Sequence, residues 1–289
     1  MDAKLFPGFK SIEHDINGTL IVGVMGGSGP PLLLLHGHPQ SHYVWHLVAQ
    51  ELAKNFTVVA TDLRGYGNSS APAGSKTHVE YSKRVMARDQ VMVMEALGFE
   101  KFQVCSHDRG ARVTHRMAVD WPDRVERAML LDIAPTLAMY KGTDMKFASA
   151  YFHWFFLIQP HPFPENILNA NPDVWSRFAG GTTPEERESY KYGLRRPAYI
   201  HSICEDYRAS ATIDLDQDRE DRKNGIKVQC PLRVLWGKKG VVAACFKPME
   251  LWKSVAANVT GREVPTGHDI SEEDPELLLE EMGNFFRSK

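Results

Sequence analysis

The chain has 289 residues, which is enough for one large domain with an inserted subdomain. Apolar residues make up 43% and charged residues 24%, a composition typical of a soluble globular protein and not of a disordered chain. The formal net charge of -2 excludes a whole-molecule field that would attract nucleic acid or an anionic membrane, so we expect neither as a partner.

The chain shows no sign of export. Its first residues lack the basic start and apolar run of a signal peptide, and no apolar stretch approaches the roughly 18 residues of a membrane span. The cysteines form no CxxC pair and are too few for a disulfide framework, so we expect reduced thiols. These features predict a cytoplasmic location.

Short apolar runs typical of strands alternate with helical segments in both halves of the chain, and this alternation predicts a mostly parallel sheet flanked by helices. The expected strands lie at residues 32–35, 56–60, 102–105, 127–131 and 231–236. The expected helices lie at residues 46–52, 81–97, 111–119, 248–257 and 275–286.

Between the two halves the pattern changes to aromatic, helix-like sequence interrupted by prolines, without a comparable strand. We therefore expect a helical cap at residues 137–224, inserted into a core made of residues 1–136 and 225–289. The predicted fold class is α/β, with a mostly parallel sheet, flanking helices and an inserted cap.

A small-x-acid-x-small pentapeptide, residues 106–110 (SHDRG), joins an expected strand to an expected helix. Small residues at both ends permit a sharp turn that presents the central side chain, and here that side chain is Asp108. The pattern by itself is weak, because an Asp before a helix is more often an N-cap.

Three further segments strengthen it: residues 36–39 (HGHP) and 62–69 (DLRGYGNS), each after an apolar strand, and Gly267-His268 before the last helix. In this order they resemble the α/β-hydrolase-fold family that contains haloalkane dehalogenases, epoxide hydrolases and haloacetate dehalogenases. The resemblance covers nearly the whole chain. Because of residues 108–112 (DRGAR), it is strongest to the haloacetate (fluoroacetate) dehalogenase group.

The resemblance implies that the Asp108 carboxylate is a nucleophile, which forms an ester that water must then cleave. A water of this kind needs a base, and His268 is the histidine in the expected place. The acid that orients it is expected to be Asp132, directly after the strand at 127–131, because residues 235–241 beyond the cap offer no carboxylate. The alternative is that Asp132 only caps a strand end.

Arg109 and Arg112 lie three residues apart, so both can emerge near the first turn of one helix. Guanidinium groups there would bind a substrate carboxylate and offset its repulsion from Asp108. This favours an anionic substrate. The alternative is that both arginines form surface ion pairs with cap acids such as Glu205 or Asp206.

In the cap, His153, Trp154 and Tyr207 resemble the three side chains that hold halide in fluoroacetate dehalogenases, although cap aromatics are more often plain core. The backbone N–H groups of His38 and Arg109 are the expected oxyanion donors. The family more often has an aromatic residue where His38 stands. The resemblance therefore does not predict the shape of the pocket near this position.

The sequence therefore predicts a hydrolytic dehalogenase of small 2-haloacids, without cofactor or metal, and a homodimer as in its relatives. The first alternative is an epoxide hydrolase with the same nucleophile and base. The second is a protein that binds an organic acid without turning it over. The presence of Asp108, Asp132 and His268 together argues against this second alternative, because a protein that only binds an acid needs no base.

Overall fold

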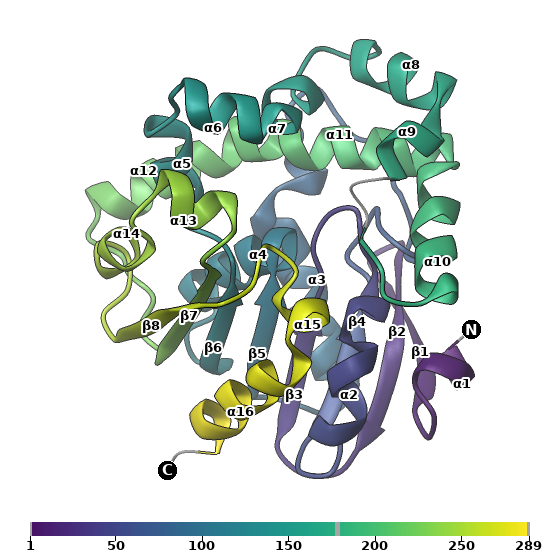
Figure 1. The fold of residues 1–289 in the computed structure, drawn as a ribbon, viewed down its shortest axis with the longest axis vertical. Coiled ribbons are helices and arrows are strands. Elements are labelled where there is room, and N and C mark those ends of the chain that lie inside the picture. Colours follow the sequence, from purple (N-terminus) through teal and green to yellow (C-terminus); the bar gives the residue numbers. More distant parts are fainter. Residues whose placement is uncertain (1, 177–179, 288–289) are drawn as a thin grey trace.

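An eight-stranded sheet forms the centre of the computed structural model, which describes residues 2–176 and 180–287 (Figure 1). The strand order is β1-β2-β4-β3-β5-β6-β7-β8. The pairings of β1 with β2 and of β2 with β4 are antiparallel, and all later pairings are parallel. The strands are Lys10–Ile16 (β1), Thr19–Gly27 (β2), Pro31–Leu35 (β3), Thr57–Thr61 (β4), Phe102–His107 (β5), Val125–Leu131 (β6), Leu232–Gly237 (β7) and Val259–Val264 (β8).

This sheet confirms the predicted fold class. Each of the five expected strands lies within two residues of β3 to β7. The sequence patterns missed β1, β2 and β8. Strands β1 and β8 are the edges of the sheet, and most of their side chains are exposed or half-buried, so they carry little of the apolar pattern that identifies a buried strand.

Helices cover both faces of the sheet, because successive side chains of a strand point to opposite sides. Leu33 and Leu35 of β3 pack in one apolar cluster with residues of α3 and α4, whereas Leu32 and Leu34 pack in another with residues of α2 and α16. These helices are His46–Leu52 (α2), Lys83–Ala96 (α3), Asp108–Asp120 (α4) and Pro275–Phe286 (α16).

A layer of helices, α5 to α12, follows β6 in the chain and precedes β7, and Figure 1 shows α6, α7, α8 and α11 above the sheet. The layer occupies the region where the sequence predicts a cap; the cap limits themselves stay a prediction. The helices are Thr136–Lys141 (α5), Met145–Ala150 (α6), Phe152–Leu157 (α7), Phe163–Ala170 (α8), Pro172–Ser176 (α9), Pro184–Leu194 (α10), Pro197–Ala211 (α11) and Ile213–Lys223 (α12).

The remaining helices are short. None of the helices in residues 2–176 and 180–287 combines the length and hydropathy that a membrane crossing requires. The short helices are Asp2–Leu5 (α1), Val241–Cys245 (α13), Pro248–Lys253 (α14) and Ile270–Glu273 (α15), with 3₁₀ turns at His42–Trp45 and Val79–Tyr81.

Candidate active site

Asp108 lies at the sharp turn between β5 and α4. Its φ of 40° is uncommon for a residue with a side chain, and such strain is typical of functional turns. The turn depends on small neighbours: a Cβ on Gly37 would lie 2.7 Å from the Cβ of Asp108, and one on Gly110 would lie 2.5 Å from the carbonyl oxygen of His36. The close approach of these segments presents the carboxylate above the sheet.

The carboxylate of Asp108 is an anion in this setting. The backbone N–H of His38 donates to its Oδ2 at 3.1 Å, as expected of an oxyanion donor. Burial opposes ionisation, but the charges of His268, Arg112 and Arg109 outweigh it and hold the pKa of Asp108 well below its usual range. The matching role of the Arg109 backbone N–H stays a prediction.

Asp132 directly follows β6 and contacts the predicted base. Its Oδ2 lies 2.6 Å from Nδ1 of His268, and its Oδ1 accepts the backbone N–H of Gly237 at 2.9 Å. Burial favours a neutral imidazole, yet the hydrogen bond and charge of Asp132 outweigh it and raise the pKa of His268 to about 10. Asp132 is therefore placed to orient His268 through Nδ1, and its catalytic role stays a prediction.

A cavity of about 280 Å³ lies over these groups. Of the predicted residues, Asp108, His268, His38 and His153 line it. This volume suits a small organic molecule. The sequence patterns missed several other residues that line the cavity, namely Pro39, Ala150, Tyr151, Phe152, Trp175 and residues 239–241.

The guanidinium group of Arg109 is fully buried and points toward α11. Its Nε and Nη2 donate to the two carboxylate oxygens of Asp206, both at 2.8 Å, and Nη2 also donates to Ser210. Its Cζ lies 4.2 Å from the ring centroid of Tyr207. Arg109 thus pairs with Asp206, one of the two cap acids named in the alternative interpretation. That alternative expected a surface ion pair, whereas this pair is buried and holds Arg109 inside the protein.

Arg112 is held by other elements. Its Nη1 donates to Oγ1 of Thr136 at 2.9 Å and to the carbonyl oxygen of Ala134 at 3.2 Å, and its Cζ lies 4.6 Å from the ring of Trp154. Among the described residues, Nη1 of Arg109 and Nε of Arg112 have no hydrogen-bond partner. Each arginine therefore retains one buried donor, although neither side chain is among those that line the cavity over Asp108.

The three predicted halide residues come together. The ring centroid of Tyr207 lies 5.8 Å from that of His153 and 6.4 Å from that of Trp154. Burial lowers the pKa of His153 to about 4 and raises the pKa of Tyr207 well above its usual value. The imidazole is neutral and the phenol is protonated, so each offers one hydrogen to an anion.

The sequence has His38 where the family more often has another aromatic residue, and in the structure its ring contacts Trp175. The indole Nε1 of Trp175 donates to its Nε2 at 3.1 Å. Burial lowers the pKa of His38 to about 3, so the ring is neutral and carries its proton on Nδ1. No sequence signal could have identified Trp175, because the two residues are 137 positions apart and meet only through the cap.

Comparisons with known proteins identify the family of the chain. Residues 30–224 match the model of the alpha/beta hydrolase fold family. A fluoroacetate dehalogenase from Burkholderia sp is 44% identical over 98% of this chain and 97% of that protein. A soluble epoxide hydrolase from Corynebacterium sp. (strain C12) is 32% identical over 94% of this chain and 95% of that protein.

Among solved structures, a protein from Nostoc sp PCC 7120 assigned to the α/β hydrolases superposes with a TM-score of 0.95. It is 48% identical, and the match covers 98% of this chain and 100% of that chain. The chain therefore belongs to the α/β-hydrolase fold family, and within it to the group of its fluoroacetate dehalogenase relative.

Proposed function

We propose that this protein is a hydrolytic dehalogenase that converts small 2-haloacids, such as fluoroacetate and chloroacetate, to a 2-hydroxy acid and halide. The observation that carries the proposal is the anionic Asp108 beside two buried arginines that each keep an unpartnered N–H. Two carboxylates ~4 Å apart repel by about 4 kcal/mol at an effective dielectric of about 20. An anionic substrate therefore needs these cations.

In the first step, Arg109 and Arg112 bind the substrate carboxylate and align its α-carbon with Asp108. A carboxylate oxygen of Asp108 forms a bond to the α-carbon while the carbon–halogen bond breaks. The halide leaves with the bonding electron pair and accepts hydrogen bonds from His153, Trp154 and Tyr207, which stabilise the charge as it develops.

In the second step, His268 takes a proton from water, and the hydroxide attacks the ester carbonyl of Asp108. The backbone N–H groups of His38 and Arg109 hold the oxyanion of the tetrahedral intermediate. The bond from Cγ of Asp108 to the substrate oxygen then breaks, this oxygen takes the proton that His268 had accepted from water, and the 2-hydroxy acid leaves. Formation of the ester removes the negative charge of Asp108, one of the charges that raise the pKa of His268. His268 therefore loses its proton more readily after the ester has formed, which is when it must act as a base.

The first experiment follows free halide with ion-selective electrodes after the purified protein is mixed with chloroacetate or fluoroacetate. We expect the unaltered protein to release halide and the Asp108→Ala variant to release none. Asp173→Ala is the control, because it removes an exposed acid that pairs with Arg195, and it should release halide normally. Release of chloride without release of fluoride would still identify a hydrolytic dehalogenase. It would mean that the halide pocket does not stabilise fluoride well enough for the carbon–fluorine bond to break. Stoichiometric binding of the acid without release would support a non-catalytic binding protein.

Epoxide hydrolysis is the second candidate, and two tyrosines favour it. Burial holds the pKa of both Tyr151 and Tyr207 well above the usual value, so both phenols keep their protons and can donate a hydrogen bond to an epoxide oxygen; Tyr151 also lines the cavity over Asp108. A neutral epoxide has no carboxylate for the arginines to bind. Arg112→Met should abolish haloacid turnover but spare epoxide turnover, so a neutral epoxide tested on this variant separates the two functions.

We further propose that the protein acts as a homodimer in the cytoplasm and needs no cofactor or metal for this reaction. The location rests on the cysteines without disulfides, and the dimer rests on exposed apolar side chains on the cap. Asp108, His268 and water supply every reacting group in the two steps above, so the proposed reaction uses no cofactor or metal.

A further inference from the structure

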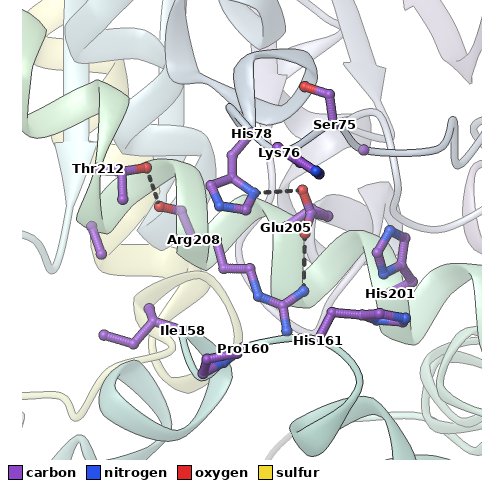
Figure 2. A pocket seen from close by; sticks show the side chains of 12 residues that line it. Ser75, Lys76, His78, Ile158, Pro160, His161, His201, Glu205, Arg208 and Thr212 are labelled. Carbon is purple, nitrogen blue, oxygen red and sulfur yellow. Dashed lines mark hydrogen bonds and ion pairs between the residues drawn. The ribbon is translucent and has the colours of Figure 1, made fainter.

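A second cavity, of about 650 Å³, lies between α11 and the loop that contains residues 74–78 (Figure 2). His201, Glu205 and Arg208 line it from α11, where the spacing of four and three residues puts them on one side of the helix. His78 and His161 line it from other segments, and Figure 2 shows His161 beside His201. None of these residues has a role in the reaction proposed above.

Three possible metal ligands converge at one end of this cavity. Nδ1 of His161 lies 3.3 Å from Oε1 of Glu165, and Nδ1 of His201 lies 3.2 Å from the same oxygen. The three ligand atoms all lie within 4.8 Å of one another. In a tetrahedral zinc site, ligands about 2.0–2.1 Å from the ion are about 3.3 Å from each other. Both nitrogen–oxygen distances match that spacing.

Oε1 of Glu165 has more neighbours than it can satisfy by hydrogen bonding. Nη1 of Arg208 donates to it at 2.6 Å, in addition to the two imidazole nitrogens. A carboxylate oxygen has only about two acceptor positions. An ion between the imidazoles and this oxygen resolves the crowding, because both nitrogens then face the ion with a lone pair and only Arg208 remains as a hydrogen-bond donor.

Arg208 has the role of an outer group that fixes a metal-binding carboxylate. Its Nη2 donates to Oε2 of Glu165 at 3.0 Å, and Nη1 also donates to Glu205 at 2.9 Å. Arg208 therefore holds both oxygens of Glu165 in place before any ion arrives.

The site is also accessible. The side chain of Glu165 is 5% exposed, whereas those of His161 and His201 are 63% and 31% exposed. The anionic ligand is thus anchored inside the cap, while the two imidazoles border the cavity and the solvent. A fourth coordination position can be filled by water from the cavity.

We propose that His161, Glu165 and His201 bind one divalent ion of the zinc type and thereby link α8 and the residues before it to α11. Two imidazoles and one carboxylate favour Zn²⁺ or Co²⁺ over Mg²⁺ or Ca²⁺, which prefer all-oxygen sites. Because α11 also carries Asp206 and Tyr207, the ion steadies the helix that holds Arg109 and the halide pocket.

The test is calorimetric titration of chelator-treated, tag-free protein with Zn²⁺, together with the visible absorption spectrum of the Co²⁺ form. We expect one ion per chain and, for Co²⁺, the intense bands of a four-coordinate site. His161→Gln and His201→Gln should each weaken binding roughly 100-fold or more, because loss of a ligand costs more than the 10–100-fold loss typical of outer groups.

His78→Gln is the matched control. His78 lines the same cavity, but its imidazole pairs with Glu205 and not with Glu165. The His78→Gln protein should therefore bind the ion as the unaltered protein does. His161 is largely exposed, so its variant keeps the fold even if His201→Gln does not. Failure of the unaltered protein to bind Zn²⁺ at millimolar concentration, or equal binding by the His161 variant, would overturn the proposal. Neither outcome bears on halide release.

Discussion

Asp108 and His268 carry opposite charges in the free protein, and each stabilises the charge of the other. The first proposed step needs the anion of Asp108. The second needs His268 without its proton, while Asp132 keeps the ring in place through Nδ1 at 2.6 Å. The two steps therefore depend on different protonation states of the same residues, and this gives two predictions.

Replacement of His268 by Gln should stop the reaction at the ester. The first step does not need a base, so each active site should release one halide and then turn over about 10²–10⁴-fold more slowly. Intact-mass measurement should show the protein heavier by one carboxymethyl group, and peptide mapping should place the group on Asp108. Asp108→Ala should acquire no such mass. Steady turnover by His268→Gln without accumulation of the ester contradicts this assignment.

The raised pKa of His268 also predicts how stability depends on pH. The folded pKa of about 10 exceeds the ordinary value of 6.5, so protonation stabilises the fold fully below about pH 6.5. This contribution falls as pH rises toward 10. The difference in unfolding free energy between the unaltered protein and His268→Gln, measured by urea denaturation across this range, should shrink with increasing pH. A difference that grows with pH would show that the folded pKa is not raised.

At the scale of elements, α4 and α11 are joined through one buried carboxylate. Asp206 accepts hydrogen bonds from Arg109 of α4, from Tyr66, and from Lys83 of α3. Breaking a buried pair by removing one partner typically costs about 3–5 kcal/mol, because the remaining charge has no counterpart. Helix α4, which begins at Asp108, is thus tied to α11, which carries Tyr207.

Asp206→Asn should therefore destabilise the protein by about 3–5 kcal/mol. It should also raise KM for haloacetate more than it lowers kcat, because Arg109 loses the partner that positions it for the substrate carboxylate. Urea denaturation and initial-rate kinetics measure the two effects.

The control for this prediction is Asp173→Asn, which removes an exposed partner of Arg195 and should cost no more than about 1 kcal/mol. An Asp206→Asn protein with unchanged KM would mean that Arg109 does not bind the substrate.

At the scale of the whole molecule, the cap exposes large apolar side chains. Phe163 and Ile167, one helical turn apart on α8, are 56% and 48% exposed, and Phe152 on α7 is 42% exposed. Apolar groups gathered on one surface are typical of an interface between subunits. They support the proposed homodimer, and the pair on α8 is the surface through which we expect it to form.

Light scattering should give twice the mass of one chain. Phe163→Glu combined with Ile167→Glu should shift the protein to the monomer, because a charge buried in an apolar contact has no partner. Leu47→Glu is the control: this residue of α2 is 39% exposed but lies in the core domain, so the dimer should persist. A dimer that survives the double substitution would place the interface elsewhere.

The sequence by itself predicted the fold class and the turn at Asp108, and the family resemblance added Asp132 and His268 as its expected partners. The first two are local patterns: Asp108 stands directly after a strand and between small residues, so its position follows from the element before it. The spacing of Arg109 and Arg112 likewise predicted that both lie near Asp108, although it did not show that different elements hold them.

Only the tertiary structure decided which residues complete the site. Asp206 meets Arg109 across 97 positions of the chain, and Trp175 meets His38 across 137. The group of His161, Glu165 and His201 likewise joins two cap helices. Such contacts leave no periodic or local signal, because they arise from the packing of the helical layer on the sheet, and that packing depends on the shapes of many side chains at once.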